Sequence, residues 1–175
     1  MERIEIGVND FIIKPIKNWC EDWFLLCAGD YKSKHYNFMT VAWGGFGVMW
    51  DKPISMIVVR PSRYTYQFLE KYETFTLNGF SVKYKDKLLL CGSKSGRQID
   101  KVKGTGLTII ASKKVEAPSF DEAELIIECK KIYYQDFINK NFLDKEIEIN
   151  YNGKDYHRMY YGEIVRIAGI EEYKK

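Results

Sequence analysis

The stretch Arg60–Thr65, with the sequence RPSRYT, contains two arginines, a serine, a threonine and a rigid proline. It follows an apolar run, and Ser62 is expected to cap a helix that extends roughly to Tyr72. The first amide groups of a helix lack intrahelical partners, so Arg63 and Thr65 would lie beside an anion site. A phosphate monoester, with about 1.5 to 2 negative charges near pH 7, matches such donors. The alternative is an ordinary helix cap whose arginines pair with surface carboxylates.

A second stretch combines small residues with donors: Ser95, Gly96, Arg97 and Lys101, within GSKSGRQIDK (92–101). We expect a short helix that begins at Ser95-Gly96 and ends near Gly104, with Arg97 and Lys101 on one face. Gly96 would let the backbone approach a ligand closely. Two donor clusters at helix starts are explained most simply by one shared anion. Alternatively, Lys101 lies on a solvated face beside its polar neighbours.

A third stretch, HYNFMTVAWGGFGVMW (35–50), places two polar residues, Asn37 and Thr40, in an aromatic run that is rich in glycine. Its glycines, at 44, 45 and 47, leave room for something flat against the backbone. This composition suits a planar, partly polar ring better than a phosphate. Taken alone, the stretch also reads as a buried strand followed by a glycine turn.

The elements around these clusters are mostly strands. Segments rich in β-branched and aromatic residues occur at 54–59, 74–80, 107–112, 124–135, 145–157 and 160–170. Asn152-Gly153 is the strongest hairpin signal, because both residues tolerate a positive φ. A helix is also expected from Ser81 to Gly92. This pattern predicts a mainly β fold, either a barrel or a sandwich.

Length and composition favour a single soluble domain spanning residues 1–175. The net charge of +3 is too small to indicate a nucleic-acid-binding protein. The four cysteines lack metal-site spacing with either histidine, so we expect structural thiols and no zinc. The apolar runs are too short for a membrane span, and no leader segment is recognisable. The cytoplasm is therefore the expected compartment.

The order N-x-M-T-x-A-W (37–43), R-P-S-R-Y-T (60–65), F-T-L-N (75–78) and S-G-R-x-x-D-K (95–101) resembles the flavin reductase-like FMN-binding split-barrel family. The likeness is greatest to its flavoredoxin-type members and covers roughly residues 10–170. It implies a six-stranded antiparallel Greek-key split barrel with a few short helices. It also implies a homodimer that binds FMN near the subunit interface and is reduced by NAD(P)H or by a protein donor.

The same resemblance implies the roles of individual residues. The isoalloxazine ring and ribityl chain would be bordered by Asn37, Met39, Thr40, Val41 and Trp43. The phosphate would be held by Arg60, Ser62, Arg63 and Thr65, with Ser95, Gly96, Arg97 and Lys101 closing from the other side. Asn78 is a further candidate near the flavin. His157 either approaches the ring or lies in an exposed turn, and Gln98 replaces an acid that is usual in the family.

An oxidoreductase that passes electrons from NAD(P)H through FMN to an unknown acceptor is the function expected from this resemblance. Because a flavin carries the chemistry, no catalytic acid or base is required, and none is assigned. The main alternative is an FMN-binding electron carrier that is reduced by a partner protein and has no nicotinamide site. A barrel that binds single-stranded nucleic acid is less favoured, since the basic residues form two clusters and no continuous stripe.

Overall fold

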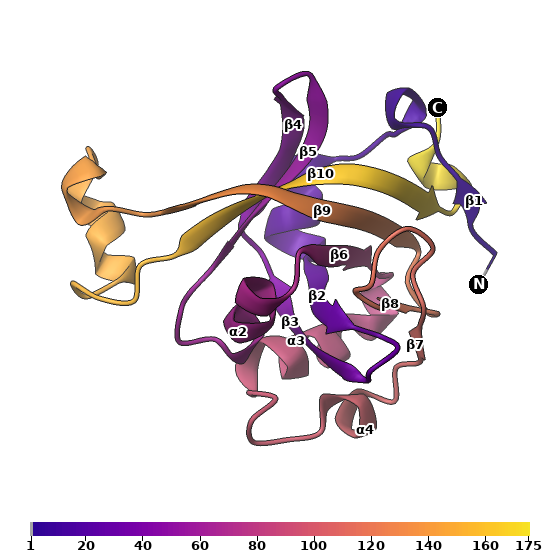
Figure 1. The fold of residues 1–175 in the computed structure, drawn as a ribbon, viewed down its shortest axis with the longest axis horizontal. Helices are drawn as coiled ribbons and strands as arrows, with labels where there is room; N and C mark the ends of the chain where they lie inside the picture. Colours follow the sequence, from indigo (N-terminus) through magenta and orange to yellow (C-terminus); the bar gives the residue numbers. More distant parts are fainter. Residues whose placement is uncertain (1) are drawn as a thin grey trace.

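The computed structural model describes residues 2–175 as a mainly β protein with short helices around one large sheet (Figure 1). Its strands are β1 (Ile4–Glu5), β2 (Phe24–Asp30), β3 (His35–Val41), β4 (Gly44–Met49), β5 (Lys52–Val59), β6 (Thr74–Gly79), β7 (Ile109–Ile110), β8 (Ser119–Phe120), β9 (Leu125–Asp136) and β10 (Arg158–Gly169). Its α-helices are α1 (Pro15–Lys17), α2 (Tyr64–Lys71), α3 (Lys85–Ser93) and α4 (Lys101–Thr105). Short 3₁₀ helices occupy Val8–Asp10, Val82–Tyr84, Asn139–Asn141, Lys145–Asn150 and Glu171–Tyr173, and a π-helical turn occupies Asn18–Asp22.

The main sheet is antiparallel and has eight strands, in the order β3-β2-β6-β9-β10-β5-β4 with β1 added beside β10. The predicted number of six strands is therefore wrong, and the sheet does not close into a barrel. β10 is long enough to pair with two strands along one edge: β5 pairs with its first half and β1 pairs with its last residues. The predicted mainly β, antiparallel architecture with short helices is confirmed.

The opening in the sheet lies between its two end strands, β3 and β4, although these follow one another in sequence. The chain leaves β3 after Val41, and β4 then folds back along β5. Among residues 2–175, no ladder joins β3 to β4 or to β5. The carboxyl ends of β3 and β5 line one cavity, and the candidate site is built there.

Strand β2 is buried on both faces, so its residues read as an almost continuous apolar run. One face, with Phe24 and Leu26, joins a core that is completed by α2. The other face, with Leu25 and Cys27, joins a second core that is completed by α3. Three of the four unpaired cysteines, at positions 27, 91 and 129, are buried, as expected of structural thiols.

Most of the predicted strands are present. The segments 54–59, 74–80, 124–135 and 160–170 correspond to β5, β6, β9 and β10. The segment 107–112 contributes only the two residues of β7, and the strand predicted over 145–157 is wrong. Instead, Lys145–Asn150 forms a 3₁₀ helix, because the β9–β10 ladder ends before this segment and offers it no partner strand. Asn152 and Gly153 do adopt positive φ, but their turn follows a 3₁₀ helix inside the long connection between β9 and β10 and is not a tight turn directly between paired strands.

The predicted helix starts are displaced. Arg63, not Ser62, is the N-cap of α2, and Ser62 lies in the preceding turn. The helix expected between Ser81 and Gly92 is confirmed as a 3₁₀ turn followed by α3. No helix begins at Ser95-Gly96, because the chain becomes helical only after Asp100. The side chain of Asp100 accepts a hydrogen bond from the Lys103 amide and caps α4.

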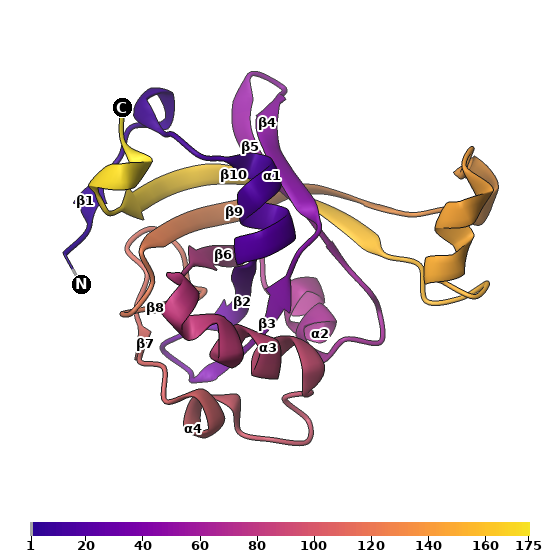
Figure 2. The same ribbon diagram turned by 180° about the vertical axis from the view of Figure 1, so that it is seen from behind.

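Strands β9 and β10 form a long ribbon that carries residues 137–157 at its far end (Figures 1 and 2). At the other end of this ribbon lie both termini, where β1 pairs with β10. None of the helices among residues 2–175 is long and apolar enough to cross a membrane.

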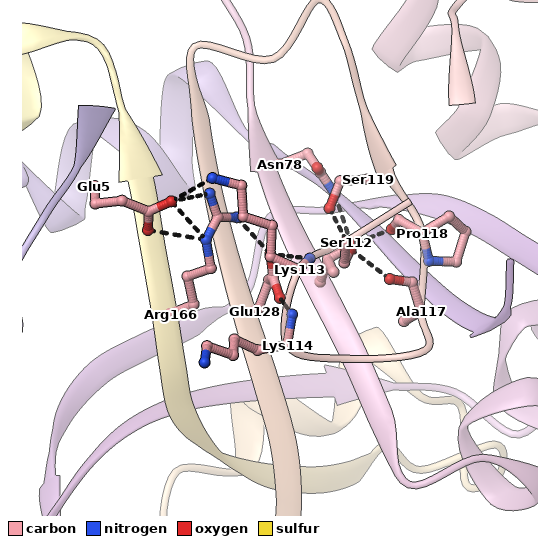
Figure 3. Close-up of polar contacts among 11 residues, drawn as sticks. Glu5, Asn78, Ser112, Lys113, Lys114, Ala117, Pro118, Ser119, Glu128 and Arg166 are labelled. Carbon is pink, nitrogen blue, oxygen red and sulfur yellow. Dashed lines mark hydrogen bonds and ion pairs between the residues drawn. The ribbon is translucent and has the colours of Figure 1, made fainter. Parts of the chain in front are cut away.

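A buried carboxylate anchors the loop that precedes β8 (Figure 3). Glu128 on β9 is fully buried and accepts hydrogen bonds from the backbone amides of Lys113 and Lys114, at 3.0 and 2.6 Å. It also pairs with Arg166 on β10, which in turn pairs with Glu5. These charge-assisted bonds satisfy the carboxylate and fix the loop to the sheet on the β9–β10 side.

Candidate functional site

Two adjoining cavities lie at the opening between β3 and β5. Cavity 1 has a volume of about 200 Å³ and is lined by Met39, Thr40, Val41, Ala42, Trp43, Val58, Val59, Arg60, Arg63 and His157. Cavity 2 has a volume of about 120 Å³ and is lined by Asn37, Met39, Ser62, Arg63, Tyr64, Thr65, Cys91, Gly92, Lys94, Ser95, Gly96 and Lys101. Met39 and Arg63 line both, so the two cavities form one trench with chemically different ends.

The donors of the turn at residues 60–63 and of the start of α2 have two kinds of partner: some bind the segment 137–157, and others face cavity 2. Arg60 lines cavity 1, but its guanidinium donates to the Asn150 carbonyl at 2.6 Å and lies 5.0 Å from the centre of the Tyr151 ring. Ser62 donates to a carboxylate of the same segment. Thr65 instead faces cavity 2, and Arg63 lines both cavities. Arg60, which was expected beside the phosphate with these two residues, therefore lies at the ring-sized end of the trench.

Cavity 2 contains a tightly fitted group of small and polar residues. Asn37 is buried and donates from Nδ2 to Thr65 Oγ1 at 2.7 Å. A Cβ on Gly96 would overlap the Asn37 Oδ1 atom, so only glycine fits at this position. Since Asn37 already donates to the Thr65 oxygen, the Thr65 hydroxyl proton is available to another acceptor. The predicted approach of the 95–96 backbone to the first cluster is therefore present, without the predicted helix.

Lys101 brings a buried positive charge to cavity 2. It is 5% exposed, and its Nζ donates to the carbonyls of Phe38 at 2.8 Å and Cys91 at 2.9 Å. Burial lowers its pKa, and none of the ion pairs among residues 2–175 includes it. An ammonium group with two carbonyl partners and no counter-ion retains one donor and an unneutralised charge. The alternative of a solvated face for Lys101 is wrong, and the cavity favours an anion.

Arg97 supports the site from outside. It is exposed, its planar guanidinium lies over the Tyr64 ring with Cζ 4.6 Å from the ring centre, and Nη1 donates to the Ser62 carbonyl oxygen at 3.3 Å. No helix connects Arg97 to Lys101, so the prediction that the two side chains share one helix face is wrong. Arg97 thus contacts the turn at Ser62 through a hydrogen bond. Ser95 and Gly96 line cavity 2.

The ring-sized end of the trench is bordered by aromatic groups. His157 is 8% exposed, and its Nδ1 lies 2.9 Å from the Tyr151 hydroxyl. Its ring centre lies 5.1 Å from that of Trp43, which is 48% exposed at the rim. Burial, assisted by the positive charge of Arg60, lowers the pKa of His157 to about 4, so the imidazole is neutral at pH 7. The alternative of an exposed turn residue for His157 is wrong.

Two other predicted site residues have different environments. Thr40 lines cavity 1, but its hydroxyl donates to the Leu88 carbonyl at 2.5 Å and so ties β3 to α3. Asn78 is fully buried and donates to the Leu25 carbonyl and to Thr76 Oγ1. It lies near Ser119, on the side of the sheet that faces the loop before β8 (Figure 3), and it lines neither cavity.

Sequence reasoning missed several wall residues. Val58 and Val59 line cavity 1, and their position just before Arg60 on a predicted strand was an available signal. Tyr64 follows Arg63 directly and could have been included for the same reason. Tyr151 and Asp155 reach the site from a segment that was predicted as a strand, and no local pattern marks them.

Comparisons with known proteins agree with this arrangement. Residues 22–175 match the family model described as flavin reductase like domain, and the chain belongs to this family. An uncharacterized protein of Pyrococcus abyssi is 31% identical over 81 residues, which are 46% of this chain and 46% of that protein. The chain thus spans less than half of this relative's length.

Two solved structures share the fold. The flavoredoxin of Desulfovibrio vulgaris (Miyazaki F) is 24% identical, with a TM-score of 0.67 over 92% of this chain and 73% of that one. The FMN-binding protein from Thermus thermophilus with bound 1-cyclohex-2-enone is 19% identical, with a TM-score of 0.65 over 87% and 75% of the two chains. The predicted resemblance to the flavin reductase-like family is confirmed, and the fold is shared with a flavoredoxin.

Proposed function

We propose that the trench binds FMN and that the protein is an NAD(P)H-dependent flavin oxidoreductase with an unknown electron acceptor. The observation that carries this proposal is the chemical difference between the two ends of the trench. One end has mostly apolar and aromatic walls beside Arg60 and Arg63, and the other has small residues, hydroxyls and the unpaired, buried Lys101. A ligand with an aromatic ring system at one end and a phosphate at the other, joined by a polar chain, would match these two ends. The family membership supports a flavin as this ligand.

Cavity 2 would hold the phosphate. Lys101 and Arg63 supply positive charge, Thr65 supplies a hydroxyl proton, and Gly96 keeps the backbone close enough to donate. Asn37 orients Thr65 and keeps its oxygen occupied. Ser95 and Ser62 complete the polar wall, and Arg97 braces it from outside. Dianionic phosphate would thereby neutralise the buried ammonium.

Cavity 1 would hold the flavin ring between the end of β3 and the end of β5. Met39, Val41, Val58 and Val59 offer apolar surface, and Trp43 shields the ring at the rim. His157 is neutral, so it can exchange hydrogen bonds with a ring heteroatom without adding charge. The bound flavin would supply hydride and electron transfer, while these residues bind it, orient it and exclude water.

The first test is the visible absorbance spectrum of the purified, dialysed protein, followed by anaerobic addition of NADH or NADPH. A flavin spectrum that bleaches on addition of either nucleotide would support the reductase. Colourless protein that also leaves added FMN fluorescence unquenched would overturn flavin binding.

The second candidate is an FMN-binding electron carrier that is reduced by a partner protein. An exposed aromatic side chain at the rim of the ring-sized end favours it, since Trp43 lines cavity 1 and is 48% exposed. A flavin spectrum that does not bleach with nicotinamide nucleotides would favour this carrier over the reductase.

The proposal also includes a cytoplasmic homodimer whose flavin lies near the subunit interface. Unpaired buried cysteines fit a reducing compartment. A second copy would cover the exposed aromatic groups of the β9–β10 ribbon, which include Tyr133 and Tyr134. Analytical ultracentrifugation with and without FMN tests this assembly, and a monomer under both conditions would contradict it.

A further inference from the structure

The segment between β9 and β10, residues 137–157, contacts the turn that precedes α2 through two residues of that turn. Arg60 donates to the Asn150 carbonyl, and Ser62 binds Asp155. The segment lies at the far end of the long ribbon, so these contacts hold it beside the trench (Figures 1 and 2).

Ser62 holds the Asp155 carboxylate with two donors, as an anion-binding site would hold its ligand. The Ser62 amide donates to Asp155 Oδ1 at 3.0 Å, and the Ser62 hydroxyl donates to Oδ2 at 2.6 Å. Asp155 has a φ of 58°, a left-handed conformation that Asp and Asn adopt more readily than most residues with a Cβ. From this turn its carboxylate reaches Ser62.

Ser62 is also a wall residue of cavity 2. A serine hydroxyl has one proton and can donate it to only one acceptor at a time. In the structure this acceptor is Asp155. An anion that enters cavity 2 beside Arg63 and Lys101 would compete with Asp155 for the same proton, and it would also repel the carboxylate.

The same segment forms part of cavity 1. His157 lies two residues beyond Asp155 and lines cavity 1, and Tyr151 holds its Nδ1. Asp155 is thus separated by a single residue from the wall of the ring-sized end. The two ends of the trench are connected through this short stretch of chain.

We propose that the Asp155–Ser62 contact is a displaceable latch. A phosphate group in cavity 2 takes the Ser62 hydroxyl, releases Asp155 and loosens residues 150–155, which lie next to His157 in the wall of cavity 1. The latch itself is independent of the flavin, but its physiological trigger, a phosphate-bearing flavin, rests on the proposed function.

Hydrogen–deuterium exchange of the ligand-free protein tests the latch directly. The amides of Tyr151 and Asn152, which donate to the Glu148 carbonyl, report on the segment. Asp155→Asn, which tolerates the same backbone conformation, and Ser62→Ala should each accelerate their exchange about fivefold. Asp51→Asn is the matched control, because Asp51 has a φ of 55° in another turn. Exchange that is equal in the wild type and both latch variants would overturn the proposal.

Inorganic phosphate, with chloride at equal ionic strength as reference, tests the displacement. Phosphate should accelerate exchange in the wild type and have no further effect in Asp155→Asn. FMN should act like phosphate, while riboflavin should not. Phosphate that slows exchange or leaves it unchanged would overturn the displacement. Failure of both flavins to bind would overturn the proposed function, and the phosphate result would still decide the latch.

Discussion

Gly96 faces the side chain of Asn37 so closely that a Cβ at position 96 would overlap the Asn37 amide oxygen. Asn37 in turn donates to Thr65, so the loop before α4, strand β3 and helix α2 meet at one point of cavity 2. The packing of these three stretches, which are far apart in sequence, thus requires that residue 96 has no Cβ.

Gly96→Ala should therefore weaken FMN binding by about tenfold or more, because Asn37 must move and release Thr65. Gly47→Ala is the control, since a Cβ there meets nothing within 4 Å. Fluorescence titration with FMN measures both variants. Equal affinities for the two variants would show that the contact between Gly96 and Asn37 does not shape the site.

Lys101→Met should weaken FMN much more than riboflavin, because only FMN carries the phosphate. Loss of a charge-assisted hydrogen bond of about 1.5–3 kcal/mol corresponds to roughly 10- to 150-fold in affinity. The protein should still fold, because removal of a buried charge that has no counter-ion offsets part of the cost of leaving the Phe38 and Cys91 carbonyls without this donor. Lys103→Met, on the exposed side of α4, is the control. An equal loss for FMN and riboflavin would place Lys101 away from the phosphate.

His157 should make the protein less stable at mildly acidic pH. Its pKa is about 4 in the folded protein and about 6.5 in the unfolded chain, so the unfolded chain binds more protons between these values. Stability is therefore lost as the pH falls from about 6.5 towards 4. After allowance for partial solvent contact, the loss between pH 7 and pH 5 should be about 1–2 kcal/mol.

Urea unfolding at pH 7 and pH 5 measures this effect. His157→Gln, which cannot be protonated, should reduce the difference between the two free energies of unfolding, and His35→Gln at an exposed position should not. An unchanged difference in His157→Gln would contradict the assignment of a buried, neutral imidazole.

Glu128→Gln should destabilise the protein by about 3 kcal/mol, because it leaves Arg166 without its buried partner and weakens two backbone contacts (Figure 3). Glu5→Gln, which removes the more exposed partner of Arg166, should cost less than about 1 kcal/mol. Both variants should bind FMN normally, since neither residue lines the trench. Thermal denaturation and FMN titration test the two statements, and a loss of FMN affinity in a folded Glu128→Gln protein would contradict the second.

Much of the fold could be read from local patterns. The strands β5, β6, β9 and β10 are long β-branched runs whose preference agrees with their burial. The segment 145–150 has an equally regular pattern, EIEIN, but no neighbouring strand can pair with it, so it is helical. Strand pairing depends on the partner as well as on the segment, and this is why that prediction failed.

The sequence by itself determined the family, the antiparallel β architecture and the residue types of both donor clusters, because motif order and hydrophobic periodicity are local properties. Only the tertiary structure decided how these donors are used. It directs Arg60 and Ser62 to the segment 137–157, and it leaves Arg63 and Thr65 facing cavity 2. It also buries Lys101 without a counter-ion. The direction of a side chain and the identity of its partner depend on elements that are distant in sequence, and these meet only when the chain is folded.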